Sequence, residues 1–263
     1  DSEITVTSGA TEALYAIFAA VVRAGDEVIL LDPCYDSYAP AVELNGGRCV
    51  RIPLRLPDFS VDWQRVRDAV TARTRIILIN TPHNPTGAVL RRTDLDALAD
   101  IVRDTGIFVL SDEVYEHIVF DGVPHHSVLT HDELAPRSFV VSSFGKTYHC
   151  TGWKVGWASG PAALVSALLR VKQFLTFVNA APLQPAVAVA LDLPDSYYTG
   201  FVADLRNRRD LLVRGLSEAG FDVLTPEGTY FVTADITALG GTDGVEFCRS
   251  LPGRCGVVGV PTQ

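Results

Sequence analysis

The residues best suited to covalent chemistry lie around Lys146. The apolar run 139–142 leads into Ser143-Phe144-Gly145-Lys146, and a second lysine, Lys154, follows a few residues later. A lysine that emerges from a buried strand among glycine and serine is poorly hydrated. Such an amine loses its proton readily and can form a Schiff base with a carbonyl. Taken alone, the default interpretation of Lys146 is a surface lysine whose stem lies along apolar atoms.

A carboxylate and an amide stand in comparable positions. The run 107–111 ends at Asp112, shortly before Tyr115, and the run 75–80 leads into a rigid loop that contains Asn84. A buried carboxylate is costly unless it meets a cation or hydrogen-bond donors, and α/β sheets bind ligands at the carboxyl ends of their strands. The alternatives are a helix-capping Asp112 and a tight turn in which Asn84 bonds its own backbone.

The turn Ser8-Gly9-Ala10-Thr11 joins a short predicted strand to a helix. The N–H groups and the positive dipole end of a helix N-terminus suit a phosphate, and glycine lets the backbone come close to it. A serine or threonine at a helix start is more often only a cap, so the turn by itself is a weak indication of phosphate binding.

Apolar runs and amphipathic stretches alternate around these residues. Strands are predicted at 4–7, 27–31, 48–52, 75–80, 107–111 and 139–142, with helices over 13–21, 38–44, 63–70 and 95–104. This alternation indicates an α/β fold with a mainly parallel sheet covered on both faces. Beyond residue 160, helices are predicted at 162–176, 185–191, about 196–218 and near 244–250, and short strands at 221–224, 230–235 and 257–260. We place a domain change inside the long helix, giving a large domain, 1–203, and a partial α+β small domain, 204–263.

The composition narrows the classes of partner. The 263 residues are 48% hydrophobic and 20% charged, as in a globular protein with a large core. A net charge of -9 argues against nucleic acid, because phosphate backbones are bound by clustered Lys and Arg. No apolar run reaches the roughly 18 residues of a membrane helix, and the six histidines show no metal-ligand spacing. The five cysteines form no CxxC pair, and we expect reduced thiols in a cytoplasmic protein.

In order and spacing, these segments resemble the aspartate-aminotransferase superfamily, the fold-type-I enzymes that depend on pyridoxal 5′-phosphate (PLP). The methionine and kynurenine aminotransferases resemble the chain most closely. The blocks that carry the resemblance are DPCYDSYAP, NTPHNPTG, SDEVYEHI and SSFGKTYHCTGWKVGW, and it extends to Glu227-Gly228-Thr229-Tyr230-Phe231. It implies a seven-stranded mixed, mostly parallel sheet and a C₂ homodimer with the cofactor near the two-fold interface.

The resemblance also implies a role for each site residue. Lys146 would hold the cofactor as a Schiff base and carry the proton between the substrate Cα and the cofactor, and Asp112 would keep the pyridinium nitrogen protonated. Tyr115 and Asn84 would bond the 3′ oxygen of the ring, and Tyr35 would stack on the ring. The phosphate would be held by Gly9, Ala10, Thr11, Ser143 and Lys154.

The implied reaction moves an amino group from an amino acid, with methionine or an aromatic amino acid favoured, to a 2-oxo acid. Two alternatives remain: a carbon–sulfur β-lyase, and the ligand-sensing half of a transcription regulator built on the same fold. The family binds the substrate α-carboxylate through an arginine near its C-terminus and closes the pocket with an N-terminal segment. These 263 residues contain no counterpart of either, so we expect a complete cofactor site and an incomplete substrate site.

Overall fold

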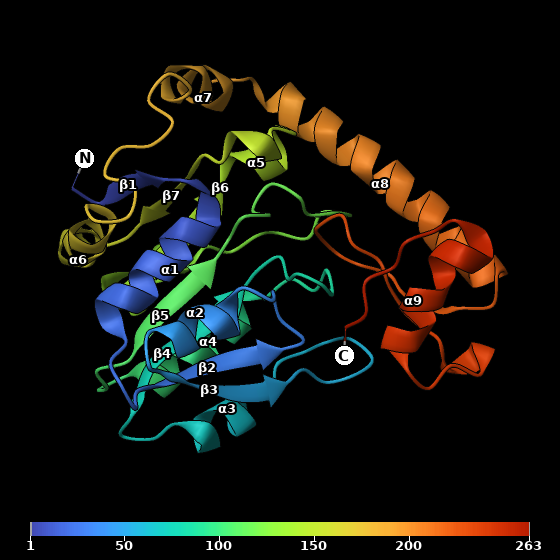
Figure 1. The fold of residues 1–263 in the computed structure, drawn as a ribbon, viewed down its shortest axis with the longest axis horizontal. Coiled ribbons are helices and arrows are strands. Elements are labelled where there is room, and N and C mark those ends of the chain that lie inside the picture. Colours follow the sequence, from blue (N-terminus) through green and yellow to red (C-terminus); the bar gives the residue numbers. More distant parts are fainter. Residues whose placement is uncertain (1, 263) are drawn as a thin grey trace.

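A computed structural model describes residues 2–262 and shows an α/β core built on one seven-stranded sheet (Figure 1). The strands are, in sheet order, β1 (Ile4–Thr7), β7 (Gly156–Ser159), β6 (Ser138–Ser143), β5 (Phe108–Asp112), β4 (Thr74–Asn80), β2 (Glu27–Asp32) and β3 (Arg48–Pro53). The pairs from β6 to β3 are parallel, whereas β7 is antiparallel to both β6 and β1. The predicted mixed, mostly parallel sheet is confirmed.

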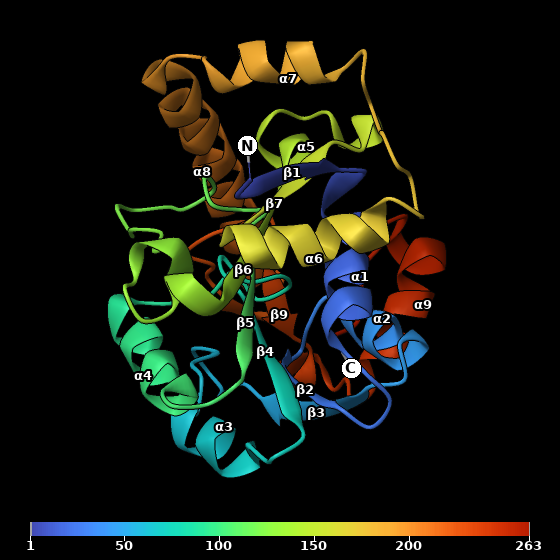
Figure 2. The ribbon, with the colours of Figure 1, turned by 90° about the vertical axis from the view of Figure 1, so that its left-hand side faces the viewer.

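Helices cover both faces of this sheet (Figure 2). One face carries α1 (Gly9–Val21), α2 (Tyr38–Leu44) and α6 (Ala162–Lys172), and the other carries α3 (Trp63–Ala69) and α4 (Arg92–Val102). The strand β2 shows how the sequence produces two cores. Val28 and Leu30 pack in the core under α1, and Ile29 and Leu31 pack in the core under α4. Because both faces are buried, the strands are continuous apolar runs rather than alternating ones.

The strand β7 is one that the local sequence pattern does not predict. Its sequence, GWAS, is short and contains glycine and serine, and its strand conformation depends on pairing with β1 and β6. Gly156 starts β7 where three segments meet. A Cβ at this position would lie 2.7 Å from the carbonyl oxygen of Ser142 and 2.8 Å from the carbonyl carbon of Gly9, so the close approach requires glycine.

The remaining elements surround the sheet or follow it in the chain. They are α5 (Phe144–Thr147), which precedes β7, and then α7 (Gln184–Leu191), α8 (Asp195–Glu218), β8 (Asp222–Leu224), β9 (Thr233–Asp235) and α9 (Gly244–Cys255). Figure 1 shows α8 leading from the side of α5 and α7 to the C-terminal elements. It is one continuous helix across the predicted domain boundary at 203/204, and that boundary stays a prediction.

Two predictions for the C-terminal part are wrong in detail. The predicted strand 230–235 is shortened to β9. Residues 227–229, which precede it, are hydrogen-bonded to the loops around residues 87 and 118 and not to a neighbouring strand of the small sheet. The run 257–260, predicted to be a strand, has no regular structure and pairs with no other strand among the described residues. A search of residues 2–262 finds no helix with the length and apolarity that crossing a membrane requires.

Candidate active site

A cavity of about 350 Å³ lies at the edge of the sheet where β4, β5 and β6 end. Its lining includes every residue that the sequence assigned to a cofactor: Gly9, Ala10, Thr11, Tyr35, Asn84, Asp112, Tyr115, Ser143, Lys146 and Lys154. Parallel pairing explains this convergence, since it sets Asn80 beside Asp112 and Asp112 beside Val141 at a single edge. The structure brings the predicted residues together, and their individual roles stay predictions.

Asp112 is the buried carboxylate of this cavity. Its Oδ2 accepts a hydrogen bond from the hydroxyl of Tyr38 at 2.7 Å, and its Oδ1 accepts one from the backbone N–H of Val114 at 3.3 Å. Burial raises the pKa of Asp112 to about 6, although the Tyr38 bond, the Val114 bond and the charge of Lys146 act against this rise. Burial also raises the pKa of Tyr38 well above its ordinary value, so Tyr38 stays a neutral donor.

Two glutamates hold the segment that follows Asp112. Glu113 accepts hydrogen bonds from the Ser111 hydroxyl at 2.8 Å and from the Val128 N–H at 3.1 Å. Glu116 accepts one from the Ser142 hydroxyl at 2.7 Å, and burial raises its pKa to about 7. These bonds tie the end of β5 to its neighbours, so the loop that carries Asp112 is fixed from both sides.

Lys146 lies in the short helix α5, directly after β6. Its Nζ donates a hydrogen bond to the hydroxyl of Tyr230 at 3.0 Å and lies 5.4 Å from the ring centroid of Tyr115. The helix can pack here only because residue 145 is glycine, since a Cβ at Gly145 would lie 2.6 Å from the Cα of Thr151. The amine is therefore bonded to the Tyr230 hydroxyl at the wall of a cavity that also contains the buried Asp112 carboxylate and the Tyr115 phenol, and it does not lie along an apolar surface.

The loop 80–87 is closed by Asn80 rather than by Asn84. The Asn80 side chain accepts the backbone N–H of Asn84 at 2.7 Å and donates to the carbonyl oxygen of Asp112 at 2.8 Å. Asn84 itself lines the cavity, as does Tyr115, whose pKa burial raises well above its ordinary value. A neutral phenol and an amide at one wall can both donate a hydrogen bond to an anionic oxygen.

The first turn of α1 forms the opposite end of the cavity. Ser8 makes no side-chain cap hydrogen bond, so the capping alternative is not what the structure shows at this turn. Gly9 has φ of +76°, a conformation that favours glycine, and it lies against the backbone of Lys154, whose own φ is +50°. A helix N-terminus, the Thr11 and Ser143 side chains and the Lys154 ammonium make this end of the cavity suitable for a phosphate.

Sequence reasoning missed two tyrosines of this site. Tyr38 begins α2, three residues after Tyr35, and the two rings meet edge to face at 5.5 Å between centroids. Tyr35 precedes the helix, so no helical periodicity in the sequence marks the contact between the two rings. Tyr230 reaches Lys146 from 84 positions away in the sequence, and no local signal marks that contact.

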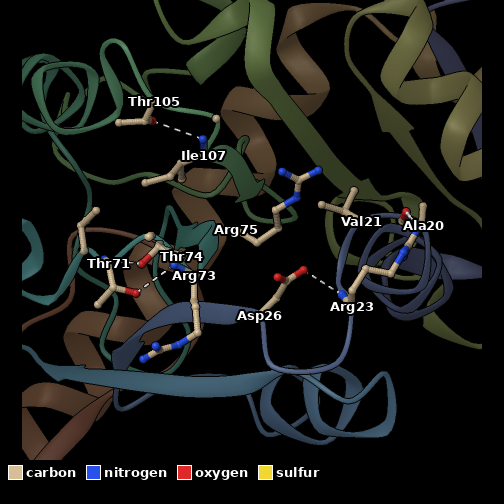
Figure 3. A pocket seen from close by; sticks show the side chains of 13 residues that line it. Ala20, Val21, Arg23, Asp26, Thr71, Arg73, Thr74, Arg75, Thr105 and Ile107 are labelled. Atoms are coloured by element: carbon tan, nitrogen blue, oxygen red, sulfur yellow. Dashed lines mark hydrogen bonds between the residues drawn. The ribbon is translucent and has the colours of Figure 1, made fainter.

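A larger groove, of about 520 Å³, lies at the opposite edge of the sheet, where the strands begin (Figure 3). Two of its arginines form hydrogen bonds to neighbouring groups of the protein. The Arg73 guanidinium bonds Glu27 at 2.8 Å, and the Arg23 guanidinium bonds carbonyl oxygens at the end of its own helix, such as that of Ala20 at 3.0 Å. Its lining, as far as the structure describes it, holds no lysine, cysteine or histidine, so the smaller cavity is the better candidate for covalent chemistry.

Comparisons with known proteins agree on one family. The family model described as aminotransferase class I and II matches residues 1–263. A methionine aminotransferase of Escherichia coli is 48% identical over 261 residues, with 99% of this chain and 68% of that protein covered. A probable N-succinyldiaminopimelate aminotransferase of Mycobacterium tuberculosis is 47% identical over 264 residues, and the match covers 99% of this chain.

Solved structures give the same result for the fold. A crystal structure of an E. coli protein with methionine aminotransferase function superposes with a TM-score of 0.95 at 48% identity, over 100% of this chain and 69% of that one. The chain spans about two thirds of the length of the curated relatives it matches, 66% of the M. tuberculosis protein.

Proposed function

Because the chain belongs to the class I and II aminotransferase family, we propose that it binds PLP and transfers an amino group from an amino acid to a 2-oxo acid. The observation that carries the proposal is the juxtaposition in one cavity of the Lys146 amine, the buried Asp112 carboxylate and the helix N-terminus at Gly9. The three groups match the aldehyde, the ring nitrogen and the phosphate of PLP, respectively.

The residues present fit this cofactor electrostatically. A buried carboxylate whose pKa burial has raised gains most from a cationic partner, and a protonated ring nitrogen supplies one. PLP, when bound, supplies an electron-accepting ring that makes the substrate Cα–H acidic. Lys146 would bond the cofactor's aldehyde carbon between turnovers and, once released, take the Cα proton on Nζ.

The other predicted residues would hold the ring in place. Asn84 would donate a hydrogen bond to the ring's 3′ oxygen, and Tyr115 would turn its single O–H from Tyr230 to the same oxygen. Tyr35 would cover one face of the ring. The phosphate would be bound by the remaining five residues: Gly9, Ala10, Thr11, Ser143 and Lys154. These assignments are supported by the common cavity that all ten residues line.

We propose methionine or an aromatic amino acid as the donor. The similarity to the methionine aminotransferase supports this choice, and so do the aromatic rings at the cavity. Tyr230 and Phe231 both pack against the ring of Tyr115, at centroid distances of 5.3 and 6.1 Å. The M. tuberculosis relative is named for N-succinyldiaminopimelate, so a donor with additional carboxylates belongs in the same screen.

A homodimer and a cytoplasmic location complete the proposal. Exposed apolar side chains follow α6, with Phe174 84% and Phe177 72% exposed, and a protein partner would cover such a surface. All five cysteines are free thiols, as expected in a reducing compartment. The acidic net charge supports small-molecule substrates rather than nucleic acid.

The cofactor assignment is tested by covalent trapping. Added PLP is expected to give a visible absorption band that shifts on borohydride reduction, with mass spectrometry locating the adduct on Lys146. Lys172 is a useful internal comparison, because its Nζ already donates to the carbonyl oxygen of Phe177 at 2.9 Å. An adduct on Lys154 or Lys172 in place of Lys146 would refute the assignment.

A screen of amino donors, with 2-oxo acid product and pyruvate release scored separately, then distinguishes amino transfer from β-elimination.

A further inference from the structure

The segment 225–231 crosses from the C-terminal elements to the rim of the candidate active site. The N–H of Gly228 donates to the carbonyl oxygen of Gly87 at 2.9 Å, which ties the segment to the loop after β4. The N–H of Phe120 donates to the carbonyl oxygen of Glu227 at 2.8 Å, which ties it to the loop after β5. The segment therefore lies between the two loops that carry Asn84 and Tyr115.

The fit between these backbones is tight enough to require glycine on both sides. A Cβ at Gly87, where φ is +72°, would lie 2.2 Å from the Cβ of Pro226. A Cβ at Gly228 would lie 2.8 Å from the carbonyl oxygen of Ile118. These backbone contacts therefore fix the position of the segment, including that of Tyr230.

This segment places the side chain of Tyr230 beside the amine of Lys146. Its hydroxyl oxygen lies 3.0 Å from Lys146 Nζ and 3.4 Å from the hydroxyl of Tyr115, and it accepts a hydrogen bond from each. The two tyrosine rings meet edge to face at 5.3 Å between centroids, with Lys146 Nζ 5.6 Å from the Tyr230 ring. Tyr230 is 43% exposed, whereas Tyr115 is buried, so Tyr230 stands on the open side of the amine.

We propose that Tyr230 is a further catalytic residue, whose hydroxyl oxygen holds the amine of Lys146 in place for proton transfer; the inference rests on the proposed aminotransferase function. The neutral amine has two N–H bonds and one lone pair. One N–H is donated to the Tyr230 oxygen, which leaves the lone pair to take the proton from the substrate Cα, and the electron pair of the C–H bond stays with the substrate. The resulting ammonium keeps its bond to Tyr230 and gives up the same proton in the next step.

The substitution Tyr230→Phe removes the oxygen and keeps the ring. In the PLP-loaded protein we expect the amino-acid half-reaction to slow about 10- to 100-fold, since a hydrogen bond to a group that becomes charged is lost. The affinity for PLP should not change, and the isotope effect with a Cα-deuterated donor should rise because proton transfer becomes more rate-limiting. In the cofactor-free protein, competitive labelling at one fixed pH should modify the Lys146 amine faster, because the amine has lost its hydrogen bond to Tyr230.

Two further variants make the test specific to the oxygen. Tyr198→Phe removes a phenol oxygen that is bonded to Tyr148 outside the cavity, and it should leave both readouts at wild-type values. Tyr230→Gln supplies a different acceptor oxygen and should bring the reaction rate and the rate of amine labelling part of the way back to wild type. Wild-type rate and labelling in Tyr230→Phe would overturn the inference, and a slow Tyr230→Gln beside a wild-type Tyr230→Phe would show that the ring matters and the oxygen does not. A wild-type protein that transfers no amino group would instead refute the proposed function.

Discussion

Asp112 is stable as a buried acid only because two donors converge on it. Tyr38 and the Val114 N–H satisfy one oxygen each, yet burial still raises the pKa of Asp112 from 3.8 to about 6. Burial therefore destabilises the ionised form of Asp112 and lowers the free energy of unfolding, and a cationic ring nitrogen beside the carboxylate would offset this loss. Two predictions at the residue scale follow from this cost.

The first concerns the rate of proton transfer. Asp112→Asn keeps the shape of the side chain but removes the charge that would hold the ring nitrogen protonated. We expect PLP still to bind, while single-turnover proton transfer slows by more than about 2 kcal/mol in barrier, or roughly 30-fold. The exposed Asp132 supplies the control, Asp132→Asn, which should have no effect. Wild-type single-turnover rates in Asp112→Asn would contradict the electrostatic role.

The second concerns the pH dependence of stability without cofactor. Between pH 3.8 and about 6 the folded state binds more protons at Asp112 than the unfolded state does, so stability falls as pH rises through this window. Asp112→Asn does not titrate. Its free energy of unfolding relative to wild type should therefore increase by up to roughly 3 kcal/mol from pH 4 to pH 7.

Urea titrations of the cofactor-free proteins across this range would measure the difference. Asn presents one carbonyl oxygen where Asp112 presents two carboxylate oxygens, and because the Asn side chain does not titrate, this difference does not produce the slope. Glu116, whose pKa burial raises, titrates in both proteins, and since the charge of Asp112 contributes only a small part of that rise, most of its titration cancels in the comparison. A difference that does not change with pH would show that Asp112 has an ordinary pKa.

At the scale of elements, the sequence predicts the strands whose own residue types determine their conformation. The runs in β2, β4 and β5 are apolar on both faces, so their strand character and their burial are evident from residue types alone. The strand β7 is not encoded in this way, because GWAS takes its conformation from two neighbours. The run 257–260 shows the converse: its apolar residues predict a strand, but it pairs with no other strand in the part of the chain described.

The residues of the candidate site likewise form two groups, those whose proximity the sequence predicts and those that depend on packing between distant segments. Lys146, Asp112 and Asn84 follow directly after predicted strands, and so their proximity follows from parallel pairing. The Tyr38 bond to Asp112 and the Tyr230 bond to Lys146 span 74 and 84 positions, and they depend on how loops pack. Side-chain packing between loops leaves no periodic signal in a single sequence.

A prediction about one loop contact tests the segment 225–231. Gly87→Ala should displace this segment, because the new methyl would overlap Pro226. Gly122→Ala is the matched control, since Gly122 has φ of +75° but no atom within 4 Å of the position that the new methyl would take. Both variants bear a left-handed backbone cost of about 1–2 kcal/mol.

Only Gly87→Ala should lose a further 1–3 kcal/mol, roughly, from overpacking. It should also change the labelling rate of the Lys146 amine in the same direction as Tyr230→Phe. Thermal unfolding and amine labelling of the two alanine variants would measure these effects. Equal behaviour of the two variants would mean that the segment does not depend on its contact with Gly87.

At the scale of the whole molecule, the proposed homodimer makes a prediction about the surface after α6. This apolar surface includes Phe174, Phe177 and Val178, which are 84%, 72% and 60% exposed. We expect a two-fold dimer that covers part of it. Phe177→Asp should therefore weaken association at micromolar concentration in light scattering, whereas Leu44→Asp, at a residue 76% exposed on α2, should not. A stable monomer that binds PLP at full occupancy would count against the dimer.

The proposed domain division predicts a difference in local stability. If residues 204–263 form a separate unit, amide hydrogens of α9 should exchange more readily than those of β4 and β5, which are buried in the sheet. The contacts of segment 225–231 with the large domain should protect its own amides to an intermediate degree. Uniform protection across the chain would indicate a single cooperative unit.

The position of β1 at the edge of the sheet has a consequence for the cofactor. Within residues 2–262, β1 pairs only with β7, and the chain continues from β1 into the first turn of α1, which lines the end of the cavity proposed for the phosphate. An anion bound there would hold β1 and the first turn of α1 to residues 143–154, which line the same cavity. Detachment of β1 from β7 and release of the phosphate would then be coupled. A ligand at 100 times its Kd would hold this edge closed by about 2.7 kcal/mol, so that cofactor occupancy would determine how often the first strand detaches.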